Sequence, residues 1–324
     1  MTGTSLNRWR RQAVVALSVV LGLLVVSCDK QALPTGPTPP PPPPPPTVQR
    51  STGPIAFVSN REGSHAIYLA DEDGSTVTRL IPTSVNSYPA WSPDRQRLAF
   101  VRQPEIYVVN ADGSGLRRIW SEGQTWGPVD WSPDGSKIAF MACCGTDKGI
   151  FVMNSDGSDL TRLIGHESAG QGCGDPGSFC GVDSPTWSPD GQQIAFYSWG
   201  GYGFGPPSGV AIINVDGTLR RFLSEAGSSP AWSPDGTKIA FDTGYFTEIG
   251  LVNADGSGRP MLLGISGEDP RWAPDGSIIF SARNEAGRTR VFITTGAGAP
   301  RLLIPEATAP ANPGYEDCCA VWAR

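Results

Sequence analysis

The sequence predicts an all-β fold, a six-bladed β-propeller of four-stranded antiparallel blades. Short apolar runs alternate with turns rich in Gly, Pro and Asp, and no long stretch has helical periodicity. A pentapeptide close to "WSPDG" recurs five times, and a sixth Trp near the C-terminus has no such turn after it. The six tryptophans are Trp91, Trp131, Trp187, Trp232, Trp272 and Trp322. Tandem units of about 40–45 residues with four short strands each are typical of propellers.

Each unit reads as four short strands. The unit that starts at Trp131 reads "WSPDGSKIAFMA", then a loop, then "GIFVMNSDGSDLTRLI". The first strand is expected to end at the Trp, and the next three correspond to "KIAF", "IFVMN" and "TRLI". Neighbouring tryptophans are 40 to 56 residues apart, and this variation lies in the loops. We expect the Trp to fill the seam between neighbouring blades.

Two recurrent turns connect the strands. In Ser-Pro-Asp-Gly, Pro favours a negative φ and Gly tolerates a positive one, which predicts a tight hairpin between the first two strands. In one unit Arg95 replaces this Gly. A second motif, Asn-x-Asp-Gly, predicts the hairpin between the third and fourth strands. It occurs at 110–113, 154–157, 214–217 and 253–256, and "TTGAG" stands in its place at 294–298.

The two ends of the repeat region complement each other. The region opens with "GPIAFVSN" from Gly53, which matches the second strand of a unit but has no Trp strand before it. The missing strand is "AVWAR" at 320–324. We therefore predict that the C-terminal strand pairs with the N-terminal blade. This pairing closes the ring and removes an open sheet edge.

These motifs resemble the TolB-type, WD40-like propeller repeats, also called PD40 repeats. The resemblance rests on the pattern "PAWSPDG-KIAF-IYVVNADGSG-RRL" and covers residues 53–324, recurring in all six units. It implies a six-bladed propeller. TolB itself also has a folded N-terminal domain that contacts its partners, whereas here only a proline-rich stretch precedes the repeats.

The N-terminus reads as a lipoprotein signal peptide over 1–27. Three arginines at positions 8, 10 and 11 precede the apolar run "AVVALSVVLGLLVV". The next residues, "VVSC", resemble a bacterial lipobox, which implies a lipid on Cys28 as the first mature residue. The alternative is an ordinary signal peptide with an incidental Cys. Asp29 resembles an inner-membrane retention signal, while the outer membrane and the cell surface remain alternatives.

Residues 28–50 are predicted to be a lipid-anchored stalk and residues 51–324 the propeller. The stalk contains a continuous proline run, which favours an extended, semi-rigid polyproline II spacer. The whole chain carries a net charge of −6, and the signal contributes three Arg and no acid. Such an acidic protein lacks the basic footprint of a nucleic-acid binder. The expected location is the bacterial cell envelope, facing the periplasm.

The longest loops are predicted to share one face of the ring, the face of the second-to-third strand loops and the inter-blade connections. Long loops on a rigid scaffold are common binding sites, and exposed aromatic side chains are frequent hot spots. The partner-binding candidates are Trp126, Trp199, Tyr202, Phe204, Tyr245, Phe246 and Tyr315, with Trp120 beside them. The alternative is that several of these side chains fold back over the blades.

Six cysteines map to the same face and are candidates for disulfides: Cys143, Cys144, Cys173, Cys180, Cys318 and Cys319. An oxidising periplasm favours disulfides, and six cysteines permit fifteen pairings. Cys173–Cys180 is the preferred bridge. The adjacent pairs either form vicinal disulfides or cross-link to a neighbouring loop. Metal binding by these thiols is the alternative, although no CxxC spacing is present.

Carboxylates precede several of the tryptophans and are predicted to line the mouth of the central channel. They are Asp130, Asp183, Glu268, Asp269 and Asp317, with Glu316 beside them and Arg271 opposing their charge. A convergent ring of this kind could hold Ca²⁺ or a cationic group of a partner. Otherwise these are solvated acidic loops. No other cofactor is expected.

The sequence thus favours a non-catalytic envelope lipoprotein whose propeller binds a protein partner through its loop-rich face. Enzyme motifs such as G-x-S-x-G do not occur in it. The runner-up is a propeller that binds or cleaves carbohydrate through the same face, since aromatic side chains also stack on sugar rings and some propellers are lyases or glycosidases.

Overall fold

The computed structural model describes residues 55–81, 88–125, 127–144, 147–165, 181–199, 208–218, 220–244, 248–296, 298–305 and 314–323. The chain divides into two units, 1–41 and 42–324, and all the described residues belong to the second. Within the described ranges, no helix has the length and apolar character needed to cross a membrane.

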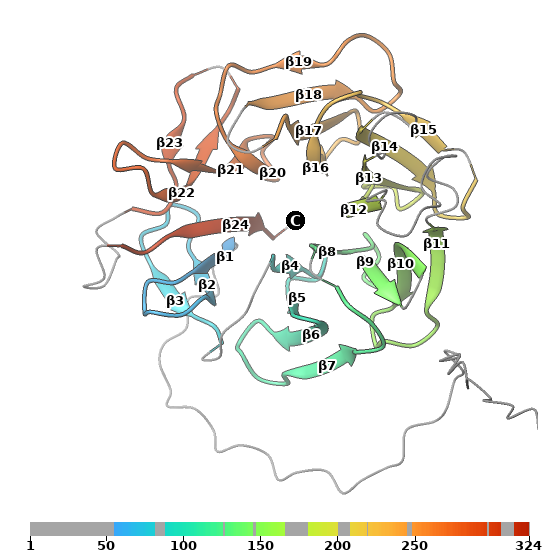
Figure 1. The fold of residues 1–324 in the computed structure, drawn as a ribbon. Helices are drawn as coiled ribbons and strands as arrows, with labels where there is room; N and C mark the ends of the chain where they lie inside the picture. The colour runs from blue at the N-terminus through green and yellow to red at the C-terminus, as the bar shows by residue number, and fades with distance from the viewer. Residues whose placement is uncertain are drawn as a thin grey trace, which may run out of the picture. The chain divides into compact units, whose positions relative to one another are not determined.

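Six four-stranded antiparallel sheets stand around a common axis as the blades of a propeller (Figure 1). The predicted fold class is confirmed. The strands of each blade are given from the axis outward: blade 1 has β24 (Asp317–Trp322), β1 (Ile55–Ser59), β2 (Ala66–Ala70) and β3 (Val77–Arg79), and blade 2 has β4 (Ala90–Trp91), β5 (Arg97–Arg102), β6 (Glu105–Asn110) and β7 (Arg117–Trp120). Blade 3 has β8 (Val129–Trp131), β9 (Lys137–Cys144), β10 (Asp147–Asn154) and β11 (Thr161–Gly165), and blade 4 has β12 (Gly181–Trp187), β13 (Gln193–Trp199), β14 (Gly209–Asn214) and β15 (Arg220–Phe222). Blade 5 has β16 (Ser228–Trp232), β17 (Lys238–Asp242), β18 (Ile249–Asn253) and β19 (Met261–Leu262), and blade 6 has β20 (Glu268–Trp272), β21 (Ile278–Arg283), β22 (Thr289–Thr294) and β23 (Arg301–Leu302).

The predicted turns form as their residues require. In blade 3, Gly135 has a φ of 70° and its N–H donates to the Ser132 carbonyl at 2.8 Å. Arg95 adopts the same left-handed conformation in blade 2, with a φ of 58° and the equivalent bond to the Ser92 carbonyl at 2.9 Å. The hydrogen bonds around the turn are therefore kept when Arg replaces Gly, at the cost of a less favourable backbone conformation.

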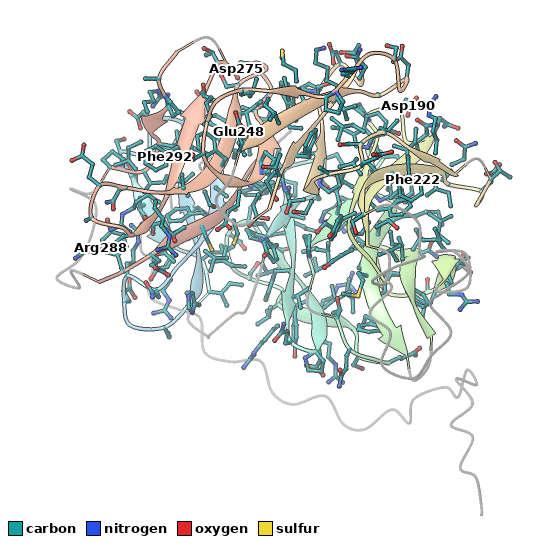
Figure 2. The ribbon with its side chains drawn as sticks, turned by 45° about the horizontal axis from the view of Figure 1, so that its top comes forward. Asp190, Phe222, Glu248, Asp275, Arg288 and Phe292 are labelled. Atoms are coloured by element: carbon teal, nitrogen blue, oxygen red, sulfur yellow. The ribbon has the colours of Figure 1, made fainter. Side chains whose placement is uncertain are left out.

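Each seam between neighbouring blades has its own apolar cluster, and each cluster contains one of the six repeated tryptophans. The cluster around Trp131 combines Ala99 and Val108 of blade 2 with Ile138 and Phe140 of blade 3. Figure 2 shows side chains filling the spaces between the blades in this way. The prediction that the Trp fills the seam is confirmed, and burial of these faces is the main stabilising contribution to the ring.

Indole N–H groups also connect neighbouring inner strands. Nε1 of Trp131 donates to the Ala90 carbonyl at 3.1 Å. Nε1 of Trp232 donates to the Thr186 carbonyl at 3.2 Å, and Nε1 of Trp272 donates to the Ala231 carbonyl at 3.0 Å. Each acceptor is the residue before the Trp of the preceding blade. At these three positions the Trp contributes both apolar area and a buried hydrogen bond, which a Phe could not supply, whereas Nε1 of Trp91 and of Trp187 is buried without a hydrogen-bond partner.

The ring closes where β24 pairs with β1, as predicted from the unfinished sixth repeat. Ile55 lies opposite Trp322, and Ser59 lies opposite Asp317. Figure 1 shows β24 in dark red beside β1 in blue. The register of the pair shifts between Ala56 and Val58, which marks a β-bulge in the closing strand.

A buried ion pair fastens the closing strand. Nη2 of Arg61 lies 2.9 Å from Oδ1 of Asp317, and the two side chains are only 3% and 0% exposed. The Arg61 guanidinium also lies 5.0 Å from the ring centres of both Phe57 and Tyr68. The predicted placement of Asp317 at the channel mouth is therefore wrong. Its carboxylate neutralises an arginine inside the blade instead.

We expect Asp317→Asn to lower the free energy of unfolding by about 3–5 kcal/mol, because it leaves the buried Arg61 charge uncompensated. Urea unfolding monitored by Trp fluorescence measures the change. The matched control is Glu62→Gln, which removes the solvent-exposed pair between Glu62 and Arg79. Surface pairs contribute about 0–1 kcal/mol. Equal losses for the two variants would contradict the role of the buried pair.

Candidate functional site

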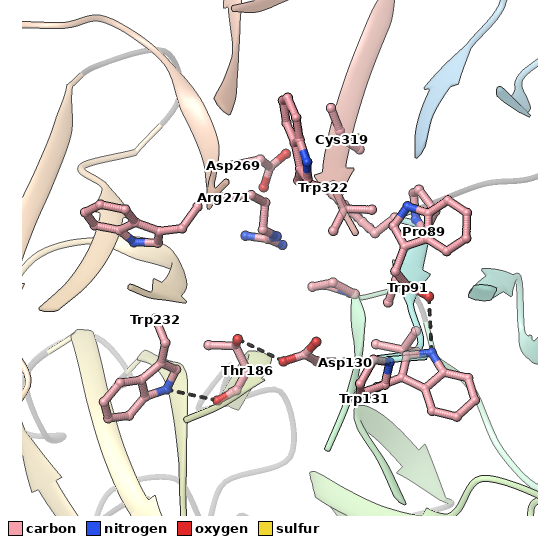
Figure 3. A pocket seen from close by; sticks show the side chains of 18 of the residues that line it. Pro89, Trp91, Asp130, Trp131, Thr186, Trp232, Asp269, Arg271, Cys319 and Trp322 are labelled. Carbon is pink, nitrogen blue, oxygen red and sulfur yellow. Dashed lines mark hydrogen bonds between the residues drawn. The ribbon is translucent and has the colours of Figure 1, made fainter. Parts of the chain in front are cut away.

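A cavity of about 380 Å³ lies on the axis of the ring. The inner strands supply its walls, and the Ser-Pro-Asp-Gly turns and their relatives supply a ring of prolines: Pro93, Pro133, Pro189, Pro234 and Pro274. Five of the six repeated tryptophans also line it, namely Trp91, Trp131, Trp232, Trp272 and Trp322. Figure 3 shows this axial cavity with its polar side chains Asp130, Asp269 and Arg271. Apolar walls with a few convergent polar groups are typical of binding pockets.

Only two of the five predicted carboxylates line the axial cavity. Asp130 stands one residue before its Trp, and Asp269 stands three residues before its Trp. The other three carboxylates are not among the lining residues. Asp183 and Glu268 stand four residues before the Trp of their blade, and Asp317 stands five residues before its Trp. Of the predicted channel-mouth carboxylates, Asp130 and Asp269 thus reach this cavity, while Asp183 and Glu268 lie close enough to Asp269 for its charge to add to the rise that burial causes in their pKa.

A recurrent β-bulge determines which positions face the axis. In four blades the residue three before the Trp is not a glycine and yet has a positive φ: Ser184 (51°), Ser229 (50°), Asp269 (52°) and Cys319 (57°). The pairing register shifts beside each of them. Such backbone conformations cost about 1–3 kcal/mol each and often occur at functional sites. Sequence reasoning missed this bulge, because no glycine marks it.

Asp269 sits at the centre of a polar cluster beside the axial cavity. Its Oδ1 accepts a hydrogen bond from Ser229 Oγ at 2.9 Å, and its N–H donates to Asp242 Oδ2 at 3.2 Å. Burial raises the pKa of the Asp269 carboxyl, and the nearby Arg271 charge opposes that rise. The guanidinium of Arg271 donates to the Pro270 carbonyl at 2.8 Å, and it has no salt bridge to any described carboxylate.

Two further carboxyls near this cluster have raised pKa values, so they keep their protons to a higher pH than usual. Burial, followed by the charges of Asp269 and Asp242, raises the pKa of Glu268 to about 7. Burial also raises the pKa of Asp183 to about 6, although the Ser184 N–H donates to its Oδ1 at 2.6 Å. The enclosure is tight, because a Cβ added at Gly127 would lie 2.2 Å from the same oxygen.

Asp130 connects two blades at the cavity wall. Its Oδ2 accepts hydrogen bonds from Thr186 Oγ1 at 3.0 Å and from the Trp187 N–H at 2.8 Å, both in blade 4 (Figure 3 draws the Thr186 bond). The Asp130 carboxylate is therefore held in a fixed position from which its free oxygen can meet a ligand. Tyr88 also lines the cavity, and the charge of Asp269 raises the pKa of its hydroxyl.

Of the aromatic candidates, Tyr315 is described and is not exposed. Its side chain is 3% exposed, and the Arg290 guanidinium lies 4.0 Å from its ring centre and donates to its carbonyl at 2.7 Å. Trp120 is likewise buried, at 4% exposure, in the seam beside Phe140. The expectation that these two side chains form an exposed rim is wrong. For Trp199 only the backbone is described. The remaining candidates lie outside the described residues: Trp126, Tyr202, Phe204, Tyr245 and Phe246.

The cysteine predictions are tested only in part. Cys28, Cys173 and Cys180 lie outside the described residues, and Cys143 and Cys144 are described only as backbone at the end of β9. Cys318 and Cys319 are free thiols in β24, with their sulfur atoms 2.6 Å apart. The described residues contain no group of three or more His, Cys, Asp or Glu placed to hold a metal ion. The Ca²⁺ that was one alternative for the channel mouth therefore finds no ligand set among them.

Comparisons with known proteins agree with the repeat pattern. The profile of the dipeptidyl peptidase IV N-terminal region matches residues 57–129. The chain is 31% identical over 150 residues to a protein TolB homolog of Chlorobium luteolum, covering 44% of this chain and 31% of that protein. It is 29% identical over 139 residues to the Tol-Pal system protein TolB of Anaeromyxobacter dehalogenans, and this match covers 41% of this chain and 29% of that protein. These matches span about a third of each relative's own length.

A solved structure shows the same fold. TolB from Acinetobacter baumannii superposes with a TM-score of 0.66 at 21% identity, covering 83% of this chain and 66% of that one. The predicted resemblance to TolB-type six-bladed propellers is confirmed by the relatives and by this structure.

We expect the free energy of unfolding to fall as the pH rises from about 4.5 to about 7, because the folded state holds the Glu268 proton over this range and the unfolded state does not. Glu268→Gln removes this contribution and makes the dependence shallower. Urea unfolding at a series of pH values tests this, with Glu122→Gln on an exposed loop as the control. An unchanged pH dependence in Glu268→Gln would contradict the raised pKa.

Proposed function

We propose that this TolB-like propeller is a non-catalytic binding module of the bacterial cell envelope. A protein partner binds at its loop-rich face, with a segment entering the axial cavity. The observation that carries the proposal is the cavity itself, where tryptophan and proline walls enclose Asp130, Asp269 and the Arg271 cation. Both hydrogen bonds to Asp130 go to its Oδ2, and Arg271 makes no salt bridge to a described carboxylate, so a segment with complementary polar groups and apolar side chains would satisfy both parts of the lining.

The similarity to TolB proteins supports a protein rather than a saccharide as the partner. Its repeats are similar to those of the Tol-Pal system protein TolB, whose name places it in an assembly. The strand order also gives the two faces different character. Gln103 and Glu225 lie on exposed connections of the loop-rich face, while Ser257 lies on a short turn of the opposite face. A partner specific for one face should therefore distinguish these positions.

The binding module is proposed to be anchored through Cys28. The apolar signal over 1–27 and the proline-rich residues 28–50 support a lipid followed by a spacer. The spacer would keep the loop-rich face accessible to envelope proteins at some distance from the lipid surface.

Photo-cross-linking in living cells tests the binding face. A photoreactive amino acid at Glu225 should give a discrete protein adduct, whereas the same probe at Ser257 should give none. In the Glu225 variant, Arg271→Ala should weaken the adduct, because it removes the cation from the cavity. Equal adducts from both faces would contradict the assigned face. Absence of adducts, combined with a saccharide-dependent change in Trp fluorescence, would favour the carbohydrate alternative.

Cell fractionation tests the anchor separately. Cys28→Ala should move the protein from the membrane fraction to the soluble fraction, because the thiol that carries the lipid is lost. Cys173→Ala is the matched control, since it also removes one cysteine but leaves the proposed lipid site intact. A membrane fraction that does not change in Cys28→Ala would rule out lipidation at this residue.

A further inference from the structure

Two consecutive cysteines stand in the closing strand with their thiols in contact. The Cys319 S–H donates a hydrogen bond to the Cys318 sulfur, and the two sulfur atoms are 2.6 Å apart. Both residues are half-buried, and Cys319 lines the axial cavity (Figure 3). The Cys319 thiol therefore lies at the cavity wall, and the Cys318 sulfur lies directly against it.

The β-bulge of the closing strand brings the two thiols together. In a regular strand, successive side chains point to opposite faces of the sheet. Here Cys319 has a φ of 57°, and the register between β24 and β1 shifts next to it. The Cys319 N–H donates to Ser281 Oγ of blade 6 at 3.1 Å, which fixes this backbone conformation from the neighbouring blade. The contact between the sulfurs thus follows from the fold of the ring.

The same bulge occurs in three other blades, where the equivalent residues are Ser184, Ser229 and Asp269. None of these three residues can form a disulfide with the residue before it, because neither member of each pair is a cysteine. Blade 1 is distinguished by having cysteine at both positions.

We propose that Cys318 and Cys319 form a reversible redox site, which is oxidised to a vicinal disulfide by exchange with a disulfide compound. The Cys318 sulfur accepts the hydrogen bond from Cys319, so it is the nucleophile. It loses its proton, attacks the donor disulfide and releases one thiol. Cys319 then loses its proton, attacks the mixed disulfide at Cys318 and releases the second thiol. The pair loses two electrons and two protons, and the donor gains both.

The bond formed in this way is expected to be readily reduced again. Consecutive Cα atoms are about 3.8 Å apart, whereas disulfides usually join Cα atoms about 4.4–6.8 Å apart. Strain of this kind makes a disulfide more reducible, and labile disulfides are typical of redox-responsive sites rather than structural ones. Oxidation would join the two side chains at the cavity wall, so the site responds to the redox state where the partner is proposed to enter.

Peptide mass spectrometry of the purified protein tests the proposal. The protein is equilibrated with mixtures of reduced and oxidised glutathione, quenched in acid, alkylated with N-ethylmaleimide and digested with trypsin. Residues 302–324 form one tryptic peptide, which contains Cys318 and Cys319 and no other cysteine. In oxidised glutathione this peptide should appear unalkylated and lighter by two hydrogen atoms. In reduced glutathione it should carry two alkyl groups.

The chain offers an internal comparison. Cys143 and Cys144 share the tryptic peptide 138–148, and their backbone keeps an uninterrupted register with β10. This pair should remain alkylated at ratios that oxidise Cys318 and Cys319. In Cys318→Ser and in Cys319→Ser, the lighter form of 302–324 should disappear. The proposal is overturned if this peptide is doubly alkylated at every ratio, carries a lasting glutathione adduct or is cross-linked to another peptide.

Discussion

The pairing of β24 with β1 is the contact on which the other seams depend. A blade can bury its two apolar faces only against its neighbours, so an open ring would expose a sheet edge and one entire seam. The closing strand is held by more than ladder hydrogen bonds, because Asp317 neutralises the buried Arg61 and Tyr315 packs against Arg290. Removing either partner of the Arg61–Asp317 pair would leave a charge in an apolar environment, which is strongly destabilising.

The inner strands also determine what faces the axis. Each one carries a Trp that packs into the seam with the preceding blade. Three residues earlier, a bulge turns a non-glycine residue into the left-handed conformation in four of the blades. The bulge position lines the axial cavity at Asp269 and Cys319, and the position before the Trp lines it at Asp130, Thr186 and Arg271. At Asp269 and Cys319 the strained backbone therefore lies at the cavity wall, an arrangement often found at functional sites.

The fold was predictable because its signals are local. Ser-Pro-Asp-Gly and Asn-x-Asp-Gly define their hairpins within four residues, and Trp322 without a following turn indicates where the ring closes. The site was less predictable, because its geometry depends on register and on residues distant in sequence. In the sequence Asp317 resembles Asp269, since each is an acid shortly before a repeated Trp, but Asp317 lies two residues further from its Trp and meets Arg61 instead.

Tyr315 illustrates the same difference between local and distant information. Nothing near it in the sequence indicates that Arg290 will lie 4.0 Å from its ring centre, because that arginine comes from the preceding blade. The aromatic character of a loop residue therefore predicted a surface role, whereas packing across the closing seam made it structural. Sequence reasoning was reliable where a motif is complete within one hairpin, and it failed where two blades supply the contacts.

The charges and the thiols of the axial cavity share one wall, so they are physically coupled. Asp269 contributes to the raised pKa of the Cys319 thiol, after the hydrogen bond to Cys318 and burial, and the Arg271 charge opposes the rise. Asp269 and Cys319 in turn both raise the pKa of Tyr88. A ligand that brings a cation close to Asp269 would therefore make the Cys319 thiol more acidic and speed the second exchange step, whereas oxidation would remove a titratable group that faces Tyr88. In the proposed redox site, occupation of the cavity and oxidation of the two thiols would therefore influence each other through the carboxylate at the bulge of blade 6.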